Sequence, residues 1–171
     1  MSAALQLRTL TQPLHDRIDA AFGAFRVDEA AGYRRFLLAH ALALPAVEAA
    51  LAGMPGLPAW RPRGALLAAD LADLGEAAPP TLPFALGSKA AAWGALYVSE
   101  GSRLGGAMLA RAVAAGLPSR YLAAAHLPGE WRALRSAIDA AAHAGGQAWL
   151  AEAQDGAAAT FALYAEAAAA V

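Results

Sequence analysis

The sequence has 171 residues, enough for one domain with a core of its own, and its formal net charge of −1 offers a phosphate backbone no general attraction. It contains no cysteine, which excludes disulfides, thiolate metal sites and cysteine nucleophiles. Hydrophobic residues make up 58% of the chain, and most of them are alanine, the strongest helix former. We therefore expect one all-α domain over residues 1–171 that does not bind nucleic acid.

The mean hydropathy of +0.38 raises the question of a membrane segment. The most apolar window, residues 36–52, is interrupted by His40, Pro45 and Glu48, and no uninterrupted apolar stretch reaches the roughly 18 residues that a membrane span needs. Polar residues recur through the N-terminal stretch, so it has no signal-peptide core. We expect a cytoplasmic protein with no membrane partner.

Apolar residues at spacings of three and four predict a first helix from near Ser2 to about Ala24. Pro13 lies within it and predicts either a kink or a helix restart near Thr11. A second helix should follow Asp28, which can serve as its N-cap. Pro45 should bend that helix.

A loop rich in proline and glycine covers residues 53–64, and a short third helix should run over 66–74, closed by Gly75. Ser88 is placed to cap a long helix that ends at Gly116, shortly before a proline. Two further helices are expected at about 129–144 and from about 147 to the C-terminus. The count is six or seven helices in an irregular bundle.

His15 and Asp19 are four residues apart in the first predicted helix, so their side chains share one face. A carboxylate in this position can bind one imidazole nitrogen and leave the other free to ligate a metal. On spacing alone, a partly exposed local pair without a ligand is the more common case.

Three glycines, Gly101, Gly105 and Gly106, fall within six residues of the long predicted helix. Each costs roughly 0.8–1 kcal/mol relative to alanine, which is reasonable if a ligand lies close against the backbone or the helix kinks. The alternative is a loop between two separate helices. A phosphate loop is disfavoured because the GxGxxG pattern and a preceding strand are both absent.

Together these two segments resemble the haem oxygenase family, in particular its bacterial biliverdin-producing branch. The N-terminal segment matches the family's proximal-helix pattern with Leu7, Arg8, Thr11, His15 and Asp19 in register. Residues 97–106, YVSEGSRLGG, are similar to its distal helix, and residues 33–51 are similar to its second conserved helix. The resemblance covers most of the chain in the right order and implies a haem oxygenase-like helical bundle.

The resemblance implies a role for each matched residue on the proximal side. His15 would ligate the haem iron as a neutral imidazole, and Asp19 would orient it. Many family members have glutamate in place of Asp19, so this sequence has the shorter side chain at that position. Arg8 would pair with a haem propionate, and Tyr97 would be a second propionate contact.

On the distal side, the resemblance implies that Gly101, Gly105 and Gly106 lie over the haem face near bound dioxygen. Ser102 stands where the mammalian-type motif has an aspartate thought to organise distal water. Serine is common there in the bacterial branch. This departure concerns the details of proton delivery more than the activity itself.

The activity implied is a monooxygenase for which haem is both substrate and cofactor. It would use dioxygen and electrons from an external reductase or ferredoxin-type protein, and release biliverdin, iron and carbon monoxide. A non-catalytic haem carrier or sensor is the main alternative. A fold relative that binds another planar ligand is the third.

The remaining histidines and arginines have structural interpretations. His40 lies on an apolar helix face and is expected to be a satisfied core residue. His126 precedes a proline in a predicted loop and should face solvent, and His143 should lie at a helix end. Arg61 and Arg63 are expected to be surface charges in contact with solvent. The alternative is that they help to dock an acidic electron donor.

Overall fold

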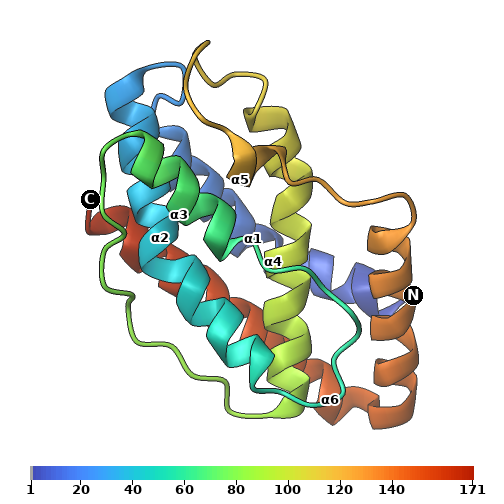
Figure 1. Ribbon diagram of the computed structural model, residues 1–171. Coiled ribbons are helices and arrows are strands. Elements are labelled where there is room, and N and C mark those ends of the chain that lie inside the picture. The colour runs from blue at the N-terminus through green and yellow to red at the C-terminus, as the bar shows by residue number, and fades with distance from the viewer. Residues whose placement is uncertain (1) are drawn as a thin grey trace.

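The computed structural model describes residues 2–171, and over this range the chain folds into helices and connecting segments without a strand. The all-α prediction is confirmed. Figure 1 shows the helices arranged as an irregular bundle. They are α1 (Ala3–Gly23), α2 (Ala30–Ala52), α3 (Gly64–Asp73), α4 (Lys89–Leu109), α5 (Arg120–Ala123) and α6 (Glu130–Ala169).

Serine side chains cap the two helices that carry the predicted site. Ser2 accepts a hydrogen bond from the Leu5 N–H at the start of α1, and Ser88 accepts one from the Ala91 N–H at the start of α4. The prediction of an Asp28 cap on α2 is wrong. Both carboxylate oxygens of Asp28 accept from the Arg26 guanidinium instead, and α2 begins without a side-chain cap.

The helix α1 continues through Pro13, so the predicted restart near Thr11 does not occur. The helix α4 likewise passes through its three C-terminal glycines, which rules out a loop there, but it ends at Leu109 rather than near Gly116. The reason lies further along the chain. The fully buried Asp70 carboxylate accepts hydrogen bonds from the backbone N–H groups of Arg120 and Tyr121, which holds the segment after α4 against α3.

The position of α4 is fixed by close packing against α6. A Cβ at Gly94 would overlap the Ala153 carbonyl oxygen, and a Cβ at Gly156 would overlap the Ala91 carbonyl oxygen. The long α6 includes a kink at Gly146, where φ is 67°, so the two C-terminal helices predicted from sequence are its two halves. Glycine is the residue that adopts this left-handed conformation without strain.

By length and composition, α2 could cross a membrane. In the structure its apolar side chains, Leu37 and Leu44 among them, are fully buried in the core. A core helix of a globular protein has the same composition, so the helix by itself is weak support for a membrane span.

Candidate functional site

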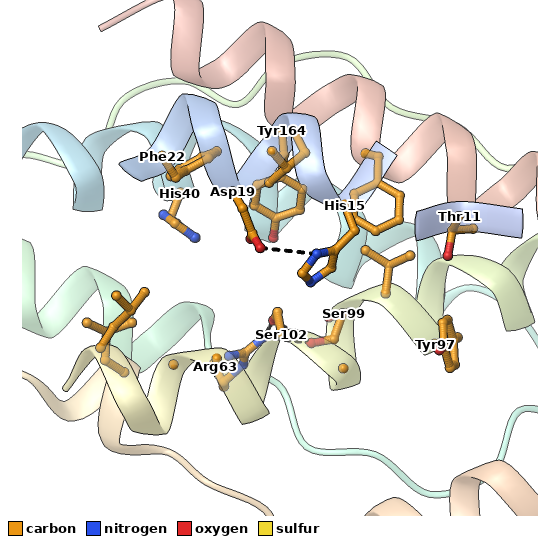
Figure 2. Close-up of a pocket in the computed structure, with 18 of the residues that line it drawn as sticks. Thr11, His15, Asp19, Phe22, His40, Arg63, Tyr97, Ser99, Ser102 and Tyr164 are labelled. Atoms are coloured by element: carbon orange, nitrogen blue, oxygen red, sulfur yellow. Dashed lines mark hydrogen bonds and ion pairs between the residues drawn. The ribbon is translucent and has the colours of Figure 1, made fainter. Parts of the chain in front are cut away.

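A cavity of about 350 Å³ lies between α1 and α4. This size falls within the range of small-molecule sites, which is roughly 300–1,000 Å³. Figure 2 shows side chains of α1 on one side of it and residues of α4 on the other. Every residue that the sequence predicts for the site lines this cavity: Arg8, His15, Asp19, Tyr97, Gly101, Ser102, Gly105 and Gly106.

The α1 wall carries His15 and Asp19, whose side chains are in contact. The His15 Nδ1 atom is 3.2 Å from an Asp19 carboxylate oxygen, and the two side chains are 55% and 66% exposed. In Figure 2 the imidazole lies in the gap between the helices, with the dashed line to Asp19 on its Nδ1 side. The Nε2 atom is therefore left free for a ligand, and the edge of the ring lies against Phe161.

One end of the cavity is marked by Arg8 and Tyr97. Arg8 is exposed and forms no ion pair with residues 2–171. Burial raises the pKa of Tyr97, while the positive charges of Arg8 and Arg135 oppose that shift. Two guanidinium groups thus lie near the tyrosine hydroxyl, an arrangement that favours carboxylates of a ligand.

The α4 wall combines three glycines with the side chains of Tyr97, Val98, Ser99, Ser102 and Leu109. A Cβ on Gly105 would meet nothing within 4 Å, so its absence leaves open space. A Cβ on Gly101 would lie 3.5 Å from the Trp131 ring, and one on Gly106 would lie 3.2 Å from the Leu122 carbonyl oxygen. Gly106 therefore also serves the packing of α4 against α5.

Ser102 belongs to a hydrogen-bonded group that the sequence did not reveal. Its hydroxyl donates to the Ser99 carbonyl oxygen at 2.7 Å and accepts from the Arg63 Nη2 atom at 2.7 Å. The same Nη2 atom donates to the Ser99 carbonyl oxygen at 2.9 Å.

The prediction that Arg63 is a surface charge is wrong, because its side chain is only 2% exposed. The Glu48 carboxylate accepts hydrogen bonds from the backbone N–H groups of Arg63 and Gly64, which fixes the end of the loop against α2. The partners of Arg63 in α4 are 36 and 39 positions away. No local pattern around Arg63 indicates this burial.

His40 and two tyrosines line the inner part of the cavity. The His40 Nδ1 atom is 2.9 Å from the Phe36 carbonyl oxygen, which confirms a satisfied core histidine. Burial lowers the pKa of His40 to about 4, so it is neutral at pH 7. Burial also raises the pKa of Tyr121 and Tyr164, which remain protonated. All three side chains are neutral polar groups in a largely apolar cavity.

No family model and no curated protein sequence matches this chain. A solved structure does: the haem oxygenase of Neisseria meningitidis, described in its NO- and CO-bound forms, with a TM-score of 0.81 and 25% sequence identity. The match covers 98% of this chain and 90% of that protein. The chain has the haem oxygenase fold. The resemblance predicted from the two motifs is confirmed.

The prediction that His126 faces solvent is wrong. Its side chain is 9% exposed and lies 3.3 Å from the Glu100 carboxylate. The ring stacks on Trp131, neither ring nitrogen has a hydrogen-bond partner among the described residues, and burial lowers its pKa. Trp131 also packs against Tyr97 and Gly101, so this cluster supports the α4 wall from behind.

Arg61 is a surface charge, as predicted, with 44% of its side chain exposed. Arg61 donates to both carboxylate oxygens of Glu130 and to the Ala125 carbonyl oxygen. These bonds lower the pKa of Glu130 to about 2. These contacts hold the loop before α6 in place, and a role of Arg61 in docking an electron donor stays a prediction.

Proposed function

We propose that this protein is a cytoplasmic, haem-degrading monooxygenase that binds haem through His15 and opens the ring to biliverdin, releasing iron and carbon monoxide. Dioxygen and an external electron donor, a reductase or ferredoxin-type protein, would be the other reactants. The observation that carries this proposal is the free Nε2 atom of His15, which lies across the cavity from the glycines of α4. The haem oxygenase fold supports it.

His15 has the surroundings that an iron ligand needs. The Asp19 carboxylate lies 3.2 Å from Nδ1 and would accept its proton, which would fix the tautomer with its lone pair on Nε2. A neutral imidazole of this kind is the usual protein ligand of haem iron. The carboxylate also keeps the ring pointed into the cavity.

The two ends of the cavity differ in polarity, which would orient a haem. Arg8 and Tyr97 mark an end that suits the propionates. Aromatic and apolar side chains, such as Phe22 and Phe36, line the opposite region and suit the hydrophobic edge of the ring. We propose that this polarity decides which edge of the ring reaches the α4 wall.

On the α4 wall, Gly101, Gly105 and Gly106 would let the backbone approach the ring closely. The Ser102 hydroxyl lines the cavity and would hold an ordered water there, from which protons are delivered. When bound, haem itself supplies the redox chemistry that activates dioxygen. The chain would hold the ring, keep one face covered and position water at the other.

The test is to mix the purified protein with haemin and then with a reductant in air, following the visible spectrum. Oxygenase activity predicts loss of the Soret band, a broad long-wavelength bilin absorbance, and release of carbon monoxide. A Gly105→Leu variant should lose this activity because its side chain enters the open space of the cavity. Gly87→Leu is the matched control, since a Cβ at Gly87 also meets nothing within 4 Å but Gly87 lies outside the cavity.

Stable haem binding without bilin formation, with chemical reductants and with ferredoxin systems alike, would contradict the oxygenase proposal. The protein would then be a haem carrier or sensor on the same fold. Failure to bind haemin at all would contradict both.

A further inference from the structure

Arg63 brings a positive charge to the cavity without an acidic partner. Its side chain is 2% exposed, and no carboxylate of residues 2–171 forms an ion pair with its guanidinium. Glu48 binds the backbone N–H groups at this point instead. Arg103, which is also 2% exposed, differs because its Nε atom donates to the Glu100 carboxylate at 2.9 Å. An unpaired buried charge costs free energy, so the isolation of Arg63 calls for a compensating role.

The guanidinium of Arg63 is held in one orientation. Its Nη2 atom binds Ser99 and Ser102, and its Cζ atom lies 5.1 Å from the centre of the Tyr121 ring. The Nε and Nη1 atoms have no hydrogen-bond partner in the described part of the chain, and they are not sealed from solvent as the His126 nitrogens are. Two N–H donor groups are therefore available at the cavity surface.

No carboxylate of residues 2–171 lines the inner wall of the cavity: Glu48, which binds the backbone N–H groups of Arg63 and Gly64, is not among the residues that line it. In Figure 2, Arg63 and Ser102 lie across the cavity from Asp19, which belongs to the α1 wall and pairs with His15. His40, Tyr121 and Tyr164 are neutral polar groups at pH 7. At Tyr121 and Tyr164 the charge of Arg63 affects the pKa more strongly than the opposing charge of Glu48 does. A fixed donor of this kind stabilises negative charge without reorganising.

We propose that Arg63 forms an anion subsite on the inner wall of the cavity, next to Ser102. It would bind a small anion, or an oxygen-containing ligand that gains negative charge, on the face of the ring opposite His15. This assignment rests on the proposed function for the presence of a haem. It does not depend on turnover.

The test uses the ferric haemin complex titrated with azide, and the ferrous complex with carbon monoxide examined by infrared spectroscopy. Arg63→Met should weaken azide binding by about tenfold or more, the usual effect of losing a hydrogen bond to a charged group. It should also raise the C–O stretching frequency, because the nearby positive charge is gone. Arg63→Lys should keep part of both effects, since it keeps the charge but loses the planar fork.

Arg111→Met is the matched control, because Arg111 is exposed and does not line the cavity. It should leave azide affinity and the C–O frequency as in the wild type. Unchanged values in both Arg63 variants would overturn the anion subsite and leave Arg63 as a structural brace. If Arg63→Met does not fold, the Arg63→Lys and wild-type values decide the question.

A wild-type protein that binds no haemin would contradict the proposed function without deciding on the subsite. Azide is then added to the ligand-free protein at constant ionic strength and the thermal midpoint is measured. The subsite predicts that azide raises the midpoint of the wild type and of Arg111→Met more than that of Arg63→Met. An equal response in all three would overturn it.

Discussion

The two helices that face each other across the cavity present different chemistry. The α1 wall offers side chains, above all His15 and Asp19, which are more than half exposed and are held mainly by each other. The α4 wall offers glycine backbone together with side chains such as Ser102, whose hydroxyl accepts a hydrogen bond from the buried Arg63. His15 can therefore be replaced without disturbing the fold, whereas the shape of the opposite wall depends on the packing of several segments.

We expect the largest loss of stability from a substitution where α4 packs closely against α6. Gly94→Ala places a Cβ against the Ala153 backbone, which cannot move aside as a flexible side chain can. We expect a loss of at least about 3 kcal/mol in the free energy of unfolding, measured by urea denaturation. Gly105→Ala on the same helix is the control. It meets open space and should stabilise the protein by up to about 1 kcal/mol.

Equal stability of these two variants would show that the α4 wall is not held by the contact at Gly94.

On the α1 wall, His15→Ala should weaken haemin binding by roughly a hundredfold, because the proposed iron ligand is lost. Changes to residues that only hydrogen-bond a metal ligand already cost about 10–100-fold in affinity. The imidazole-ligated spectrum should disappear and return in part when imidazole is added. The folding free energy should hardly change, since the side chain is 55% exposed. His143→Ala is the control, because His143 is exposed and lies outside this cavity. An unchanged spectrum in His15→Ala would remove the ligand assignment and make His40 the next candidate.

The arrangement of the α1 wall could be predicted from the sequence because it depends on residues that are close together in one helix. The spacing of His15 and Asp19 on one helix is enough to bring their side chains together. The glycines of α4 could also be recognised in the sequence, because three glycines close together lower the stability of a helix and so indicate a special role. Arg63 and His126 were not predicted, because their burial depends on partners far along the chain, Ser102 and Glu100 respectively.

The early end of α4 was missed for the same reason. The alanine-rich segment after Leu109 has a strong helix propensity. Hydrogen bonds from the following segment to the buried Asp70 override it.

His40, on the inner wall of the cavity, should make the free energy of unfolding depend on pH. The folded-state pKa of His40 is about 4, below its ordinary value of 6.5, so the unfolded chain binds a proton that the folded chain does not. Stability from this group is fully present above pH 6.5 and is lost as the pH falls from 6.5 to 4. The expected loss is about 2 kcal/mol, less than the full shift implies because the ring edge faces the cavity.

His126, whose pKa is also lowered, contributes in the same direction. His40→Gln should flatten the pH profile of the unfolding free energy over this interval. A profile as steep as that of the wild type would show that His40 is not the group responsible.

We expect a smaller effect on haemin binding from a substitution at Arg8, at the outer end of the cavity. Arg8→Glu should weaken haemin binding by about tenfold, because an exposed charge pair is replaced by a repulsion. The bilin product should become a mixture of isomers, since the ring is no longer held in one orientation. Arg17→Glu makes the same charge change on α1 outside the cavity and should change neither quantity. A single bilin isomer from Arg8→Glu would mean that other groups orient the ring.

The most direct test of the whole account is the crystal structure of the haemin complex. We predict a haem between α1 and α4 with its iron bonded to the Nε2 atom of His15, and its propionates next to Arg8 and Tyr97. The α4 backbone at Gly101 and Gly105 should cover the other face. Iron bonded to a different histidine, or a haem bound outside this cavity, would contradict the account.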